Sequence, residues 1–335
     1  MGIDRPDRPA SLPPPDYANR VLGCLLGGAV GDAFGREVEF MHMPEIRHRF
    51  GPAGMTEPVL HGGRLVVSDD TQMTLFTLEG LVRAQAAGCL ADPDATLEHV
   101  RLATLDWYLT QSDAPAKARY AGSLGRAPVV QHRRAPGNTC LSACARGATG
   151  TIGRPINDSK GCGGVMRVAP VGLVRKYTAG QAFELGARAA AQTHGHPEGY
   201  LPAGAMAAIV RGLVEGLELR VAASGALRLL DGRPQAGPTR TALEAALAPG
   251  ASVPGLGEGW VGEEALAIGL YAALFTETYE DAIRLASNHD GDSDSTASIA
   301  GQLVGAWKGA GAVPGAWAEG LDCAAELTKL ARELA

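Results

Sequence analysis

Two acidic clusters hold the side chains best suited to chemistry in this chain. Ser68-Asp69-Asp70-Thr71 and, about 220 residues later, Asp290-Gly291-Asp292-Ser293-Asp294-Ser295 each combine carboxylates with neighbouring hydroxyls. Carboxylates this close repel one another, so a folded protein keeps them ionised only by supplying counter-charge. A hard divalent cation with all-oxygen ligands supplies it most simply. If the fold brings both clusters together, they predict a site for two metal ions.

The second cluster imitates the start of a calcium-binding loop. Asp290, Asp292 and Asp294 match positions 1, 3 and 5 of an EF-hand. That loop also requires Gly at position 6 and Glu at position 12, where this chain has Ser295 and Gly301. The EF-hand interpretation is therefore excluded.

Each cluster alone is also typical of a turn that caps the following helix. Their joint presence, each before a stretch rich in glycine and alanine that suits close helix packing, favours a shared site. The segment Gly31–Glu39 adds further carboxylates. Asp32 or Glu39 could reach a metal or accept a proton, or either could form a surface salt bridge.

A glycine-rich loop and a histidine pair are the remaining segments of chemical interest. Asp158–Gly164 leads into an apolar stretch, and such loops present backbone N–H groups to phosphate oxygens. It matches neither the Walker pattern nor G-x-G-x-x-G, since Met166 occupies the last position, so a plain turn is the alternative. His194 and His196 favour ligand binding by hydrogen bonds or stacking over zinc binding, with a surface loop as the alternative.

Helices are the elements that must position these residues. Apolar residues recur at helical spacing from Tyr17, and again at Leu75, Leu78 and Val82, where Gly88 ends the helix. Further helices are predicted over residues 94–109, 139–146, 165–174, 179–192, 201–217, 220–230, 239–247, 261–275, 279–287, 295–307 and 318–334.

Strand signals are scarce, because Val66-Val67 and Val129-Val130 are too short to build a sheet. Residues 232–238 and 249–259 are rich in Gly and Pro and predict surface loops. Residues 1–16 are charged and proline-rich, which predicts a disordered tail and no signal peptide. We therefore predict an all-α fold with a single domain over residues 17–335.

Composition narrows the function. Of the 335 residues, 46% are hydrophobic and 20% charged, an ordinary soluble balance. The net charge of −6 argues against a membrane surface and against duplex nucleic acid as a partner. The uncharged runs of the chain, such as Val21–Gly31, are too short to span a bilayer. Six cysteines without C-x-x-C spacing predict reduced, structural thiols in the cytoplasm.

The ordered set of these segments resembles the ADP-ribosylglycohydrolase family, which includes the dinitrogenase reductase-activating glycohydrolase. The resemblance extends from about Arg20 to Lys308. Each segment is a modest signal, whereas their order is highly specific. The matching segments are Gly23–Gly35, Ser68–Thr71, Gly161–Arg167, Thr193-His194, Gly259–Leu266 and Gly291–Ser295 with Gly301.

The resemblance implies a compact orthogonal bundle of helices and a hydrolase that cleaves the glycosidic bond between ADP-ribose and an acceptor. Arginine is the first acceptor to expect, with serine, another small acceptor or a nucleobase as the alternatives, and ADP-ribose is the product. The resemblance further implies two Mg²⁺ or Mn²⁺ ions that bind the ribose hydroxyls and activate water. We expect the protein to act as a monomer.

The site residues carry over from the resemblance position by position. Two departures from the family's pattern concern Ser295, where many relatives have Thr, and Cys162, where some have Asn. The first keeps an oxygen donor, whereas the second puts diphosphate contacts through that side chain in doubt. The implied metal ligands are Ser68, Asp69, Asp70, Asp292, Asp294 and Ser295; the implied catalytic residues are Glu39, Asp70 and Asp292; and the implied substrate-binding residues are Gly161, Cys162, Gly163, Gly164, Met166 and His194.

Two rival functions share the acidic clusters. A metal-dependent phosphohydrolase acting on a nucleotide-like substrate would leave AMP or phosphate instead of intact ADP-ribose. A non-catalytic ADP-ribose-binding member, or a structural one such as a crystallin, would lack turnover, and the intact clusters argue against it. The loop over residues 111–126 is where we expect acceptor specificity to lie.

Overall fold

The computed structural model describes residues 16–111 and 119–335. The predicted tail therefore lies outside the described residues except for Asp16, as do residues 112–118 of the predicted specificity loop. Within the described ranges there are sixteen α-helices and no strand, only isolated β-bridges, which confirms the all-α prediction. The helices are α1 (Tyr17–Gly35), α2 (Met43–Phe50), α3 (Asp69–Ala86), α4 (Pro93–Thr110), α5 (Asn138–Ala145), α6 (Ala169–Leu173), α7 (Ala179–Ala191), α8 (Pro197–Val214), α9 (Leu219–Leu230), α10 (Gly237–Leu247), α11 (Val253–Leu256), α12 (Gly262–Phe275), α13 (Tyr279–Ser287), α14 (Ser293–Lys308), α15 (Gly315–Gly320) and α16 (Ala324–Leu334).

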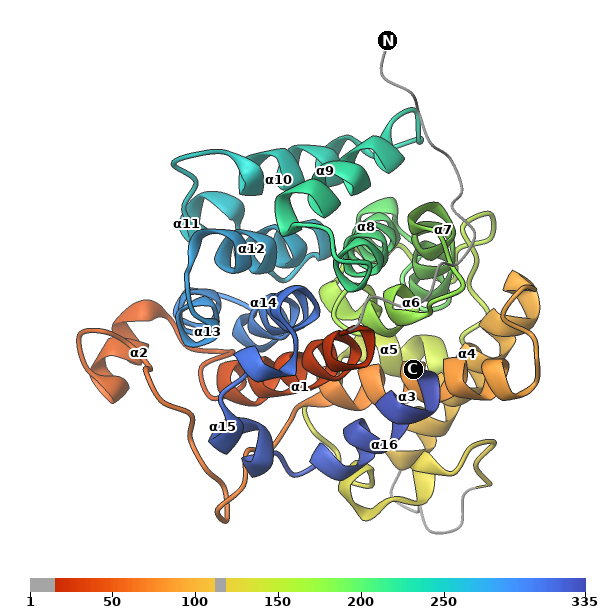
Figure 1. The fold of residues 1–335 in the computed structure, drawn as a ribbon, viewed down its shortest axis with the longest axis horizontal. Helices are drawn as coiled ribbons and strands as arrows, with labels where there is room; N and C mark the ends of the chain where they lie inside the picture. The colour runs from red at the N-terminus through yellow and green to blue at the C-terminus, as the bar shows by residue number, and fades with distance from the viewer. Residues whose placement is uncertain (1–15, 112–118) are drawn as a thin grey trace.

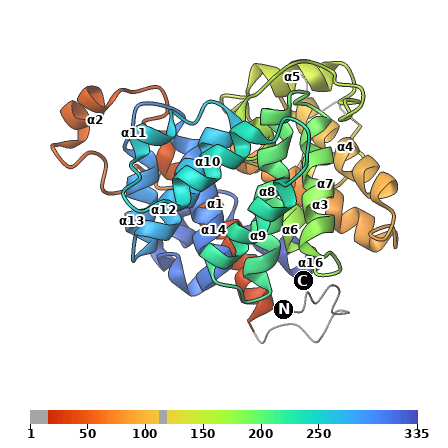
Figure 2. The same cartoon turned by 90° about the horizontal axis from the view of Figure 1, so that it is seen from above.

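The central feature is the antiparallel pair α1 and α14, which run side by side through the middle of the molecule (Figures 1 and 2). Glycines stand at every fourth position of α1, which places them on one helix face. A Cβ at Gly27 would lie 2.4 Å from the Gly301 carbonyl oxygen, and one at Gly35 only 2.2 Å from that of Ser293. Only glycine permits this approach, which brings the end of α1 to the start of α14.

The start of α3 is fixed to the same end of α1. The buried Asp32 carboxylate accepts hydrogen bonds from the backbone N–H of Ser68 at 2.9 and 3.0 Å and from that of Thr71 at 3.0 Å. These donors belong to the first turn of α3, where a helix leaves N–H groups without intrahelical partners. The first turns of α3 and α14 therefore meet at the end of α1.

Helix α2 stands away from the body of the molecule (Figures 1 and 2). The sequence patterns did not predict it, since it is short and half of its eight residues are polar. The Asp290 carboxylate accepts from the N–H of Met43 at its start. Behind it, the Asn288 side chain accepts from the Met55 N–H at 2.7 Å and donates to the Met55 carbonyl at 2.9 Å. The segment that returns from α2 is thereby held against the end of α13.

Most predicted helices are present with ends shifted by a few residues, but three predictions were wrong. The helix expected over residues 165–174 is reduced to α6 after a turn over Cys162–Gly164. The helix expected over 318–334 is interrupted at Leu321, where the Leu65 N–H donates to the Gly320 carbonyl and the Asp322 N–H to the Leu65 carbonyl. The loop expected over 249–259 contains α11. No described helix combines the length and apolarity that crossing a membrane requires.

Candidate active site

The two acidic clusters meet in the folded chain. Ser295 Oγ donates a hydrogen bond to Asp70 Oδ2 at 2.9 Å, across 225 positions of sequence. Oxygen atoms of Glu39, Asp292 and Asp294 all lie within 4.8 Å of one another. Glu39 belongs to the turn that follows α1, so the α1–α14 register delivers it to the start of α14.

Both clusters cap helices as well as forming a shared site. Ser68 Oγ accepts from the Asp70 N–H at 3.2 Å at the start of α3. Asp292 is the N-cap of α14 and accepts from the Ser295 N–H at 3.3 Å, and Asp294 accepts from the same group at 2.8 Å. Helix N-termini favour negative charge. The capping interpretation and the site interpretation are therefore compatible.

The carboxylates of Asp32, Asp69, Asp70, Asp292 and Asp294 are buried, and that of Glu39 is partly buried. Burial, with repulsion from Asp294 next in size, raises the pKa of Asp32 to about 6 and that of Glu39 to about 10. The same two causes hold the pKa values of Asp69, Asp70 and Asp292 well above their usual range.

No ion pair between described residues supplies positive charge to these carboxylates. Among the described residues, no ion pair involves Asp32, Glu39 or the four aspartates of the two clusters that carry the predicted ligands. Buried carboxylates in such a group need a cation to ionise together. The donor set of carboxylate and hydroxyl oxygens thus fits hard divalent cations.

The glycine-rich loop lies against the second cluster. Burial and the charge of Asp292 raise the pKa of the Cys162 thiol, which donates to Asp292 Oδ2 at 2.8 Å. Met166 Sδ lies 3.8 Å from Ser295 Oγ, and its carbonyl accepts from Gln302 at 2.9 Å. Gly161 pairs with Val261 in an isolated bridge. The loop is therefore fixed between α12 and α14.

His194 lies beneath this loop and is buried, so the surface-loop alternative was wrong for it. A Cβ at Gly163 would stand 2.9 Å from the imidazole, and Gly164 packs with similar closeness on Ala190. Burial, followed by the charge of Arg167, lowers the pKa of His194 to about 3. The ring is therefore neutral at physiological pH, and it supports the loop from below.

Sequence patterns missed the role of Arg167, although a charge inside an otherwise apolar run was a usable signal. Its buried guanidinium donates to the Gly163 carbonyl at 2.9 Å and to Thr193 Oγ1 at 2.7 Å. Arg167 thereby ties the glycine-rich loop to the loop that carries His194. Asp290 belongs to the second cluster in sequence but not in space. Its half-exposed side chain accepts from the Met43 N–H at the start of α2.

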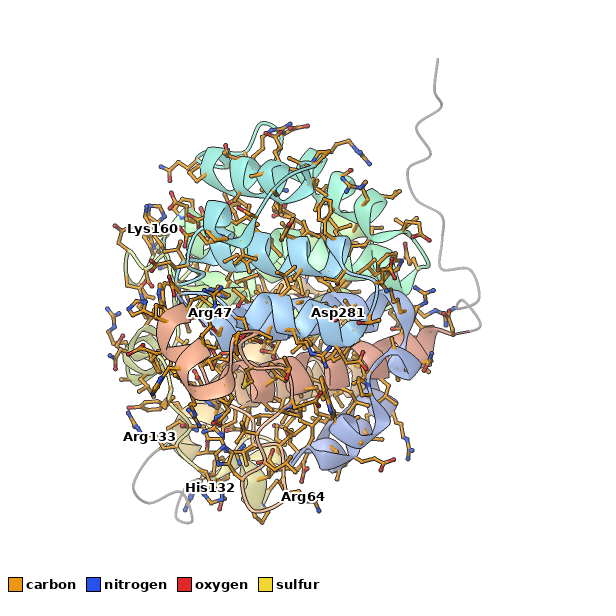
Figure 3. The ribbon with its side chains drawn as sticks, turned by 90° about the vertical axis from the view of Figure 1, so that its left-hand side faces the viewer. Arg47, Arg64, His132, Arg133, Lys160 and Asp281 are labelled. Atoms are coloured by element: carbon orange, nitrogen blue, oxygen red, sulfur yellow. The ribbon has the colours of Figure 1, made fainter. Side chains whose placement is uncertain are left out.

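Basic side chains occupy one edge of the face that carries α2. Lys160, His132 and Arg133 lie along this edge in Figure 3, and α2 with Arg47 faces the viewer. The Arg134 carbonyl accepts from the Asp69 N–H at 3.0 Å, so this segment borders the first cluster.

Comparisons with known proteins agree on one family. The family model described as ADP-ribosylglycohydrolase matches residues 13–335. ADP-ribosylarginine hydrolase Tri1 of Pseudomonas putida (strain GB-1) is 27% identical over 98% of this chain and 81% of its own. ADP-ribosyl-[dinitrogen reductase] glycohydrolase of Rhodospirillum rubrum is 28% identical over 93% of each. A solved structure titled ADP-ribosylglycohydrolase-related protein complex superposes with a TM-score of 0.63, at 26% identity, over 95% of this chain and 98% of that one.

Proposed function

The chain belongs to the ADP-ribosylglycohydrolase family and is a glycohydrolase, and we propose that it releases ADP-ribose from arginine with the help of two divalent cations. The observation that carries this proposal is the contact of Ser295 with Asp70, which unites the two acidic clusters. The arginine acceptor is supported by the similarity to the Pseudomonas putida relative, an ADP-ribosylarginine hydrolase.

Six side chains would hold the cations: Ser68, Asp69, Asp70, Asp292, Asp294 and Ser295. When bound, Mg²⁺ or Mn²⁺ supplies Lewis acidity that orients the vicinal ribose hydroxyls and lowers the pKa of water. The fit rests on buried carboxylates whose pKa values are raised by burial and mutual repulsion. The same carboxylates face a reaction in which positive charge grows on the sugar.

The reaction requires one proton acceptor and a stabilised cationic sugar. Water adds its oxygen to the anomeric carbon while the bond from that carbon to the guanidinium nitrogen breaks. In this proposal Glu39 accepts the proton of the water, which then passes to the leaving guanidine. Asp292 and Asp70 stabilise the oxocarbenium-like charge electrostatically. Glu39 performs this role only when it is ionised, which needs neighbouring positive charge because burial raises its pKa.

The diphosphate of ADP-ribose is assigned to the glycine-rich loop Gly161–Gly164. Glycines let a phosphate approach the backbone closely. The thiol of Cys162 touches Asp292, so a ligand on the loop borders the acidic centre. Lys160, at the exposed start of the loop, adds positive charge, which it shares with Glu198 at 2.8 Å.

Product analysis tests the proposal. Purified protein is incubated with ADP-ribosylarginine, with Mg²⁺, with Mn²⁺ or with EDTA, and the products are separated by chromatography. Intact ADP-ribose and free arginine, formed only with a divalent cation, support the proposal. AMP or phosphate would instead indicate the phosphohydrolase rival, and cation binding without any product would indicate the non-catalytic one.

A further inference from the structure

Phe40 and Trp260 form an exposed aromatic pair that the reaction described above does not use. Their ring centroids lie 5.8 Å apart and the rings are stacked, with 18° between their planes. Phe40 is 73% exposed and Trp260 40% exposed. Large aromatic rings so open to water leave outer faces that a planar group can cover.

The pair stands at the rim of the acidic centre. Phe40 directly follows Glu39, whose carboxylate lies beside Asp292 and Asp294. Trp260 follows Gly259, where a Cβ would stand 3.4 Å from that of Asp292. The Trp260 carbonyl also accepts from the N–H of Cys162 at 3.2 Å. The rings therefore join the turn after α1 to the segment before α12, next to the reacting centre.

Acidic side chains border the pair on the Trp260 side, where the Glu264 carboxylate accepts from the Gly259 N–H at 3.1 Å. The exposed Glu258 lies two positions before Trp260 and forms no ion pair with any described residue. Its carbonyl accepts from the Asp292 N–H at 2.8 Å, which fixes the position of its backbone against the centre. An aromatic face beside carboxylates favours a planar cation and disfavours phosphate.

We propose that the Phe40–Trp260 pair, with Glu258, is the acceptor site, where the guanidinium of the arginine that carries ADP-ribose stacks on an aromatic face. This inference rests on the proposed function. Of the parts of ADP-ribosylarginine, the adenine is neutral, the diphosphate is negative, and only the arginine end is a planar cation. Charge complementarity therefore assigns this end to the pair.

Steady-state kinetics of single variants test the assignment. The variants Phe40→Ala and Trp260→Ala are compared with Leu60→Ala, which removes another exposed apolar side chain from the segment that returns from α2. We expect KM for ADP-ribosylarginine to rise about three- to tenfold in the first two variants, with kcat kept. Competitive inhibition by ADP-ribose, which lacks the acceptor, stays at the wild-type level in all three. The variant Phe40→Trp, which keeps an aromatic face, is expected to keep the wild-type KM.

The possible failures are distinguishable. Wild-type protein that leaves ADP-ribosylarginine intact overturns the proposed function and this inference with it. Wild-type turnover combined with an unchanged KM in both alanine variants overturns the inference alone. A loss of kcat without a rise in KM would mean that the pair acts by positioning Glu39, and weaker inhibition by ADP-ribose would mean that it binds another part of the substrate. Either result also overturns the acceptor assignment.

Discussion

At the scale of the residue, Asp292 contacts or lies close to each part of the candidate site. It caps α14, accepts from the thiol of Cys162 and lies within reach of Glu39. Its carboxylate is buried among other carboxylates, so in the proposed mechanism its charge serves cation binding and does not stabilise the fold. Capping α14 needs only an oxygen that accepts a hydrogen bond, whereas the proposed cation binding needs the negative charge.

The variant Asp292→Asn separates helix capping from the proposed cation binding. The amide keeps the size of the side chain and an oxygen that can cap α14, but it removes one negative charge. We expect kcat/KM to fall at least about 100-fold, while the melting temperature of the metal-free protein does not fall, because repulsion is relieved. Asp231→Asn, a surface change on an ion pair with Arg240, is the control. Wild-type turnover by Asp292→Asn would contradict the assignment.

The raised pKa values also predict how stability depends on pH. An acid whose pKa is higher in the folded protein holds protons that the unfolded chain releases, so the free energy of unfolding falls as pH rises through that window. For Asp32 the window runs from about 4 to about 6, and for Glu39 from about 4 to about 10. Metal-free protein should therefore lose thermal stability between pH 5 and pH 8.

Divalent cations should reverse this loss. Mg²⁺ or Mn²⁺ binds the ionised carboxylates, so the gain in melting temperature on adding cation should grow from pH 5 to pH 8, by a few degrees. Differential scanning fluorimetry measures the melting temperature at each pH with EDTA and with Mn²⁺. A monovalent salt at equal ionic strength is the control. A cation effect that is equal at all pH values would contradict the electrostatic account.

At the scale of the element, the glycine register of α1 on α14 delivers Glu39 to the second cluster. Gly31→Ala should be severely destabilising, by about 3 kcal/mol or more, because its Cβ would lie 2.2 Å from the Ala297 carbonyl oxygen. Gly225→Ala is the matched control, since this glycine of α9 has only the Arg228 guanidinium within 4 Å of its Cβ position. That change should be neutral or stabilising. Chemical denaturation measures both, and equal stabilities would refute the register argument.

Helix periodicity could be predicted from the sequence wherever one face is apolar, and α13 over Tyr279–Ser287 begins and ends as expected. What could not be predicted depends on distant partners. The break at Leu321 comes from backbone hydrogen bonds with Leu65. Helix α2 starts at Met43, whose N–H donates to the Asp290 carboxylate. The contact of Phe40 with Trp260 joins two loops and follows no spacing rule.

At the scale of the whole molecule, helices from separate parts of the chain converge on one acidic centre. The first turn of α3, the end of α1 and the first turn of α14 meet there, with the glycine-rich loop beside them. The sequence could indicate the residues of this centre through their types and order. Their convergence required the fold, because nothing local links Asp70 to Ser295.

Anomalous scattering from crystals grown with Mn²⁺ tests the central claim, that both clusters share the same cations, most directly. We expect Mn²⁺ peaks within about 2.0–2.6 Å of oxygen atoms from both Asp69-Asp70 and Asp292–Ser295. Peaks coordinated by one cluster alone, or an acidic centre without Mn²⁺ at saturating concentration, would contradict it.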